Sequence, residues 1–150
     1  MKHFFNQHEK NSFIIVAGCG RLGGGLAASL SLQKKDVIVM DEREEAFRKL
    51  AASYGGLTMC GDVTNLGRLE EAGIRKADVF IAVTDKDNVN IMAAQLAKQL
   101  YGVSHVLVRI YDEEKIKLLC GTGIEAFCPT ELSEKEINRF MNWEGSEDEN

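Results

Sequence analysis

The chain has 150 residues, and its 18 basic and 23 acidic side chains give a formal net charge of −5 at pH 7. This length suits one domain, and the acidic balance argues against nucleic-acid binding, which needs a basic face toward the phosphates. No apolar run approaches the roughly 20 residues of a membrane span, and the polar start MKHFFNQHEKNS is unlike a secretory signal, so we expect a cytoplasmic protein. Its four scattered cysteines, without a C-x-x-C pair, predict reduced thiols and no metal site.

Short apolar runs alternate with helical stretches along the chain. In chain order, strands are predicted over residues 13–17, 37–40, 57–60, 79–83, 106–110 and 124–127. Helices are predicted over residues 22–32, 44–53, 66–72, 88–100, 113–119 and from 131 to about 143.

The strands are continuously apolar, which is typical of a parallel sheet covered on both faces. Together with the strand–helix alternation, this predicts an α/β fold: a doubly wound, mostly parallel, six-stranded, Rossmann-like sheet with a C-terminal exit helix. Its two halves, of three strands each, meet near residues 73–77. We expect a polar leader over residues 1–11, the folded domain over residues 12–143 and a disordered acidic tail over residues 144–150.

Glycines cluster directly after the first predicted strand, where the sequence reads GCGRLGGG. The G-x-G-x-x-G spacing between a strand and a helix is typical of a dinucleotide-binding turn. Gly18 permits the tight turn, Gly20 lets a pyrophosphate approach the backbone, and Gly23 lets the helix pack against the strand. A glycine-rich turn packed for its own sake is the alternative. We expect Gly24 and Gly25 to bring the first helix close to the sheet or to a neighbouring subunit.

Asp41 ends the second predicted strand, 18 residues after Gly23, where a ribose-binding acid is expected. A carboxylate there can accept hydrogen bonds from both ribose hydroxyls. The alternative is that Asp41 caps the helix that follows it. We favour ribose binding because the glycine motif and the acid occur together at this spacing.

With these residues in place, the chain resembles the nucleotide-binding domain of regulators of potassium conductance, the TrkA-N, KTN or RCK N-terminal family, over roughly residues 12–140. The resemblance rests on GCGRLGGGLA, VIVMDEREEAFRKLA, GDVTNLGRLEEAGIRKADVFIAVTDKDNVN and GIEAFCPTELSEKEI. It implies a regulatory subunit, not an enzyme, that binds NAD(H) or ATP/ADP and controls a membrane potassium transporter or channel. It also implies a cytoplasmic location, peripheral to the inner face of the membrane through that partner.

The resemblance further implies roles for individual residues in nucleotide binding. The glycine motif supplies the phosphate side of the site with Gly18, Gly20, Arg21, Leu22 and Gly23, and Asp41 would contact the ribose. Asp62 and Val63, after the third strand, would flank the adenine, and Thr84 and Asp85, after the fourth strand, would form the pocket floor. Two further binding residues are Arg109 and Glu131. Glu131 would point toward the nucleotide of a neighbouring subunit.

Several of these residues have a structural alternative. Asp62 could cap the helix after GDVTN, and Asp85 or Asp87 could cap the helix after TDKDN. Arg109 could pair with an acidic side chain that follows it at the surface. Arg21 could be a solvated side chain in the first helical turn.

The sequence departs from the family pattern near its end. Proline usually stands directly before the final glutamate, but here the order is Pro129-Thr130-Glu131. Many relatives continue into a second ligand-binding domain, whereas this chain stops soon after the exit helix, so we expect a separate chain to supply that domain or the nucleotide site to work alone.

The exit helix predicts self-association. Ile137, Phe140 and Met141 share one face at i, i+3 and i+4 spacing. In the family this helix crosses onto a partner subunit, which implies a dimer or a ring of eight; the alternative is that the stripe packs on its own domain.

Two other functions stay open at this point. One is the cofactor domain of an NAD-dependent oxidoreductase, although there is no room for a substrate domain and no histidine in an obvious strand-end loop. The other is a redox or energy sensor for a different partner.

Overall fold

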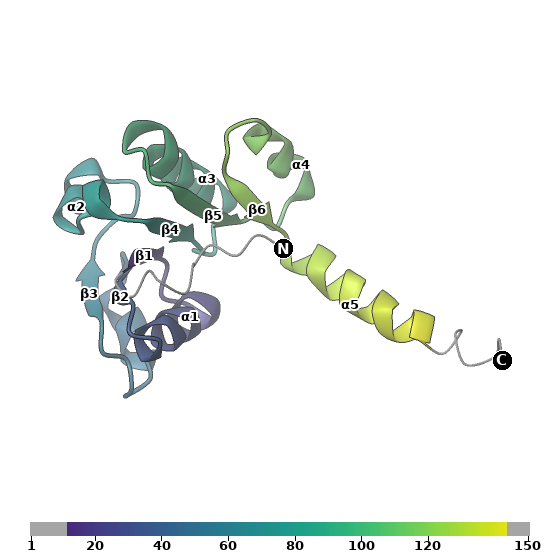
Figure 1. Cartoon of the computed structure of the whole chain (residues 1–150), viewed down its shortest axis with the longest axis horizontal. Helices are drawn as coiled ribbons and strands as arrows, with labels where there is room; N and C mark the ends of the chain where they lie inside the picture. Colours follow the sequence, from purple (N-terminus) through teal and green to yellow (C-terminus); the bar gives the residue numbers. More distant parts are fainter. Residues whose placement is uncertain (1–11, 144–150) are drawn as a thin grey trace.

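Six parallel strands form one sheet in the order β3-β2-β1-β4-β5-β6 (Figure 1). The strands are β1 (Phe13–Ala17), β2 (Asp36–Asp41), β3 (Leu57–Cys60), β4 (Val79–Ala82), β5 (His105–Arg109) and β6 (Glu125–Phe127). The computed structural model describes residues 12–143, so the leader and the acidic tail predicted from the sequence lie outside the described residues. The predicted doubly wound fold is confirmed, with every strand pair parallel.

Helical segments connect successive strands, and a last helix follows β6. The α-helices are α1 (Arg21–Leu32), α2 (Leu66–Glu71), α3 (Asp87–Gln95), α4 (Glu113–Ile116) and α5 (Pro129–Trp143). Short 3₁₀ segments are η1 (Glu44–Lys49), η2 (Ile74–Lys76) and η4 (Lys117–Leu119), and a π-helical turn, η3 (Leu96–Leu100), continues α3. No helix within residues 12–143 has the length and apolar character to cross a lipid bilayer.

Two apolar layers cover the sheet, one on each face. Side chains alternate along a strand, so Ile14 and Val16 of β1 point into one layer, with α1 and η1, while Ile15 and Ala17 point into the other, with α2 and α3. All four side chains are fully buried. Figure 1 shows α1 on one side of the sheet and α2, α3 and α4 on the other. Burial of both faces explains why the strands are apolar at every position.

The strand order of the sheet reverses between β1 and β4: β2 and β3 lie on one side of β1, and β4, β5 and β6 lie on the other. β1 pairs with β2 on one side and with β4 on the other, and the helices that follow β1 and β4 cover opposite faces. The loops that leave the carboxyl ends of these two strands therefore diverge. In open α/β sheets this point forms a crevice that binds ligands.

One predicted helix, over residues 44–53, is wrong in type and length. The segment forms only the 3₁₀ helix η1, which ends before Leu50, whose ψ of 139° is extended. Tyr54 then donates its hydroxyl hydrogen bond to the carbonyls of Val37 and Leu57, which draws the following segment back to the edge of the sheet.

Helix α5 extends away from the sheet (Figure 1). It starts at Pro129, two residues before the predicted start, and proline suits the first position of a helix. Its apolar side chains Ile137, Phe140 and Met141 are all exposed. The stripe therefore does not pack on the described part of its own domain.

Candidate functional site

A cavity of about 580 Å³ opens at the carboxyl ends of β1 to β5. Its volume suits a small-molecule ligand. Ten of the twelve residues predicted for nucleotide binding line it: Gly18, Gly20, Arg21, Leu22, Asp41, Asp62, Val63, Thr84, Asp85 and Arg109. We call the part formed by the loops after β1, β2 and β3 the β1–β3 half, and the part formed by the loops after β4 and β5 the β4–β5 half.

The glycine turn forms the base of the β1–β3 half. Gly18 has a φ of +111°, and a Cβ there would approach the backbone of Val83 and Thr84 to 2.8 Å, so only glycine fits. A Cβ on Gly23 would overlap the carbonyl oxygen of Gly18. A Cβ on Gly20 would meet nothing within 4 Å. The space beside Gly20 is therefore open for a ligand, whereas Gly18 and Gly23 hold the turn in shape.

Helix α1 presents its amino terminus to this open space. Gly20 is its N-cap, and no side chain accepts a hydrogen bond at the cap. The first N–H groups of a helix carry partial positive charge and bind anions when no side chain occupies them. Phosphate therefore suits the position between Gly20 and the cavity.

The Asp41 carboxylate links the glycine turn to the end of β2. Its Oδ2 accepts from the backbone N–H of Cys19 at 2.9 Å, and its Oδ1 accepts from the backbone N–H of Arg43 at 2.9 Å. The Arg43 Nε lies 3.4 Å from Oδ1. The negative charge of Asp41 raises the pKa of the Arg43 guanidinium. The 3₁₀ helix that follows has Arg43 as its N-cap, so Asp41 does not cap it.

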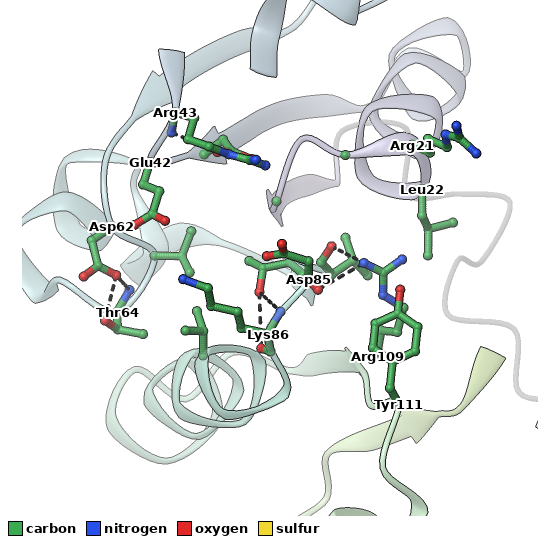
Figure 2. A pocket seen from close by; sticks show the side chains of 17 residues that line it. Arg21, Leu22, Glu42, Arg43, Asp62, Thr64, Asp85, Lys86, Arg109 and Tyr111 are labelled. Carbon is green, nitrogen blue, oxygen red and sulfur yellow. Dashed lines mark hydrogen bonds and ion pairs between the residues drawn. The ribbon is translucent and has the colours of Figure 1, made fainter. Parts of the chain in front are cut away.

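Asp62 lies on the outer wall of the β1–β3 half (Figure 2). Its Oδ1 accepts from the backbone N–H of Thr64 at 2.8 Å and from the Thr64 hydroxyl at 2.7 Å. These bonds stabilise the carboxylate and lower the pKa of Asp62. The N-cap of α2 is Asn65, which accepts from the N–H of Arg68. The capping role considered for Asp62 is therefore wrong.

Arg109 and Thr84 form the floor of the β4–β5 half. The Nη2 of Arg109 donates to the carbonyls of Val83 at 2.9 Å and of Thr84 at 3.0 Å. Its guanidinium lies 5.0 Å from the centre of the Tyr111 ring, within the range of a cation–π interaction. Figure 2 shows Arg109 and Tyr111 together, on the side of the cavity opposite Asp62. Arg109 thus contacts backbone carbonyls and an aromatic ring, in place of the surface acid considered from the sequence.

Charged side chains surround the opening. Asp85 and Lys86 are exposed in the loop after β4, and Lys86 is the N-cap of α3 without a side-chain bond. The capping role considered for Asp85 or Asp87 is therefore wrong. Arg21 is also exposed, and in Figure 2 its guanidinium points away from the other labelled side chains. Arg21 occupies the rim as a solvated first-turn side chain, so its reach to a phosphate stays a prediction.

Two predicted residues do not line the cavity. Gly23 lies behind it and acts on the shape of the turn. Glu131 lies on α5 and forms an ion pair with Lys135, in which Oε1 lies 2.8 Å from Nζ. Its predicted contact with the nucleotide of a neighbouring subunit stays a prediction.

Seven lining residues lie outside the set of twelve predicted from the sequence: Glu42, Arg43, Thr64, Val83, Lys86, Val89 and Tyr111. All of them lie within the loops that leave β2, β3, β4 and β5, or in the first turn of α3. The signal that could have found them is position, because every side chain just after a parallel strand lies at the same edge of the sheet.

The glycines beyond the motif differ from each other. Gly24 would place a Cβ in ordinary contact with Leu50 and Cys19, whereas a Cβ on Gly25 would meet nothing within 4 Å. Gly25 therefore does not bring α1 close to the sheet. Cys19 itself is buried, and burial, followed by the charge of Asp41, raises the pKa of its thiol. The described residues contain no group of three or more metal-binding side chains.

Comparison with known proteins gives matches over most of the chain. The family model of the TrkA-N domain matches residues 14–129. The Trk system potassium uptake protein TrkA of Streptomyces coelicolor is 36% identical over 134 residues, an alignment that covers 89% of this chain and 60% of that protein. The chain therefore spans less than two thirds of this relative.

Solved structures share the fold. The GsuK channel bound to NAD superimposes with a TM-score of 0.74 and 23% identity, covering 90% of this chain and 24% of that one. GsuK bound to ADP superimposes with a TM-score of 0.74 and 22% identity, covering 91% of this chain and 35% of that one.

Proposed function

The chain belongs to the TrkA-N domain family, and from this premise we propose that it is a nucleotide-binding regulatory domain of a potassium transport system. The observation that carries the proposal is the cavity at the switch point of the sheet, where the glycine turn and Asp41 meet. The relative with 36% identity is a potassium uptake protein, and the GsuK structures that share the fold hold NAD and ADP.

The ligand that suits this cavity is an adenine nucleotide, NAD(H) or ATP/ADP. In this proposal the ribose of the adenosine lies against Asp41, and the pyrophosphate lies against Gly20 and the start of α1. The adenine lies beside the loop that carries Asp62 and Val63, near the opening of the cavity. The remainder of the ligand extends toward Thr84 and Arg109. The residues named here line the cavity in the unbound chain.

Calorimetric titration of nucleotide-stripped protein tests the proposal. NADH, NAD⁺, ATP and ADP are titrated separately, with GTP as the control that keeps the phosphates and changes the base. We expect one site per chain that prefers adenine over guanine. Absence of heat from all four adenine nucleotides at millimolar concentration contradicts the proposal.

The regulatory role places the protein in the cytoplasm, at the inner face of the membrane through a transporter or channel subunit. Its direct test is potassium uptake by cells that lack the chain. Uptake should fall, and the wild-type chain should restore it, while Asp41→Ala should restore it less because the ribose contact is lost. If Asp41→Ala restores uptake as fully as the wild type does, potassium transport does not depend on nucleotide binding at this site.

We propose that the domain works as a homo-oligomer, at least a dimer, through α5. Ile137, Phe140 and Met141 expose one apolar stripe on a helix that leaves the body of the chain. Sedimentation should show a dimer or a larger ring, and Phe140→Asp should weaken it, with Asn138→Asp on the same helix as the matched control. A monomer at high micromolar concentration contradicts this assembly.

We propose no catalytic role. His105, the one histidine among residues 12–143, starts β5 at the end of the strand away from the cavity. A dehydrogenase needs a proton-transfer group beside the reacting carbon. Sustained NADH oxidation with a small carbonyl substrate that survives repurification contradicts a purely regulatory site.

A further inference from the structure

Asn90 of α3 joins the ends of two strands. It is fully buried and does not line the cavity. Its Oδ1 accepts from the Thr84 backbone N–H at 2.9 Å and from the Thr84 hydroxyl at 2.6 Å. Its Nδ2 donates to the carbonyls of Thr84 at 2.9 Å and of Arg109 at 3.0 Å. All hydrogen-bonding groups of this side chain are therefore used on two residues of the cavity floor.

Asp87, one turn earlier on α3, holds the next loop. Its Oδ1 accepts from the backbone N–H of Tyr111 and its Oδ2 from the backbone N–H of Asp112, both at 2.9 Å. Hydrogen bonds to a carboxylate are stronger than neutral ones, so Asp87 fixes the backbone that carries the Tyr111 ring. Asp87 does not line the cavity either.

Together with Arg109, these two side chains cross-link the loops after β4 and β5. Arg109 donates to the carbonyls of Val83 and Thr84 and lies over the Tyr111 ring. No comparable link runs from Asp87 or Asn90 to Asp41 or to the glycine turn among the hydrogen bonds of the described residues. The hydrogen bonds of this network therefore lie in the β4–β5 half of the cavity.

We infer that Asp87 and Asn90 are positioning residues that set the affinity for ligands extending beyond the first phosphate. The inference rests on the proposed function. A mononucleotide such as AMP contacts the β1–β3 half, whereas a dinucleotide also contacts the floor at Thr84 and Arg109. A floor already ordered in the unbound protein spares the ligand the entropy of ordering it. The pair therefore favours dinucleotides over AMP.

The test compares the Kd of AMP and of NADH, measured by calorimetry on the full chain. Asp87→Asn places an amide N–H₂ against a backbone N–H, so one of the two hydrogen bonds is lost at constant size. We expect the Kd of NADH to rise about tenfold, or 1.4 kcal/mol, while the Kd of AMP changes by less than about twofold. Asp112→Asn is the matched control, because this carboxylate lies on the same loop but caps α4 through the N–H of Glu114.

Asn90→Ala is the second variant, with Asn88→Ala as its control on the same helix, where Asn88 contacts only Lys115 among the hydrogen bonds of the described residues. Thermal unfolding of each variant is recorded, because loss of a buried amide also lowers stability. A folded Asp87→Asn that weakens AMP and NADH by the same factor overturns the inference and leaves the proposed function standing. A wild-type chain that binds neither nucleotide overturns the proposed function, and the inference falls with it.

Discussion

The β1–β3 half of the cavity is held by the glycine turn and the Asp41 carboxylate, whereas the β4–β5 half is held by three side chains from α3 and β5. In the first, Asp41 accepts from Cys19, and Gly18 and Gly23 pack against neighbouring backbone. In the second, Asp87, Asn90 and Arg109 bridge two loops. The glycine turn of the first half therefore depends on the absence of side chains, whereas the second half depends on their presence.

The difference predicts different responses to substitution. Backbone packed against backbone cannot relax, so a single methyl group there strains the fold. Side-chain links can be lost one at a time, so their removal changes affinity more than folding. Four substitutions, beginning with the largest expected effect on folding or affinity, and one chemical measurement test this difference.

Gly23→Ala should have the largest effect. The new Cβ would overlap the carbonyl oxygen of Gly18, and both atoms belong to a turn that neighbouring backbone confines. We expect the free energy of unfolding in urea to fall by about 4 kcal/mol or more, at the upper end for point mutants. Gly25→Ala, on the same helix with open space around it, should gain up to about 1 kcal/mol from helix propensity. Equal stability of the two variants would show that the turn is not confined.

Asp41→Ala should leave a folded protein with much weaker binding. Each charge-assisted hydrogen bond contributes about 1.5–3 kcal/mol, so loss of the ribose contact should raise the Kd of NADH by about tenfold or more. The wild-type carboxylate should also reject NADPH, because two like charges about 4 Å apart repel by roughly 4 kcal/mol at an effective dielectric constant of 20.

Arg43 sharpens this prediction. Its Nε lies 3.4 Å from Oδ1 of Asp41, and its positive charge can partly neutralise the 2′-phosphate of NADPH. The preference for NADH over NADPH should therefore narrow in Asp41→Ala and widen in Arg43→Gln. Titration of NADH and NADPH against the wild type, Asp41→Ala and Arg43→Gln measures this preference. Equal affinity of the wild-type protein for the two cofactors removes Asp41 from the ribose site.

Gly20→Ala should weaken binding without a cost in stability. The added methyl group meets no protein atom, and the φ of −82° suits any residue, so the fold tolerates it. It would, however, occupy the space beside the N–H groups of α1 that we propose for the pyrophosphate. We expect the Kd of ADP to rise by about fivefold, or 1 kcal/mol, with an unchanged melting temperature. An unchanged Kd would place the phosphates elsewhere.

Thiol labelling should show how rigid the glycine turn is. Burial and the charge of Asp41 raise the pKa of Cys19, so at pH 8 less of its thiol is ionised than in an ordinary cysteine. The exposed Cys60 and Cys120 should therefore react about tenfold faster than Cys19 with a disulfide reagent. Asp41→Ala should speed Cys19 labelling. Fast labelling of Cys19 in the wild type would indicate a mobile turn.

The contrast between the halves also explains what could be predicted from the sequence. The fold and the β1–β3 half depend on short-range signals: continuous apolar strands, the glycine spacing and an acid at the end of β2. The roles of Asp87 and Asn90 could not be predicted, because Asp87 bonds to Tyr111, 24 residues away, and Asn90 links Thr84 to Arg109, which lies 19 residues away. An acid or amide in a first helical turn usually indicates a cap.

Two other features depend, for the same physical reason, on contacts that no local pattern reveals. The helix predicted over residues 44–53 shortens to η1, since Tyr54 bonds to strand carbonyls that no local pattern reveals. The exposure of the apolar stripe on α5 depends on the direction in which the whole helix leaves the sheet. An amphipathic sequence pattern is the same whether the apolar face packs on its own domain or on a partner.

A crystal structure of the complex with NADH would show directly whether the nucleotide occupies this cavity. We expect the adenosine ribose within hydrogen-bonding distance of the Asp41 carboxylate, the pyrophosphate against Gly20, and the second half of the dinucleotide beside Thr84 and Arg109. A nucleotide bound outside this cavity, or bound with its adenosine against Arg109, would contradict this arrangement.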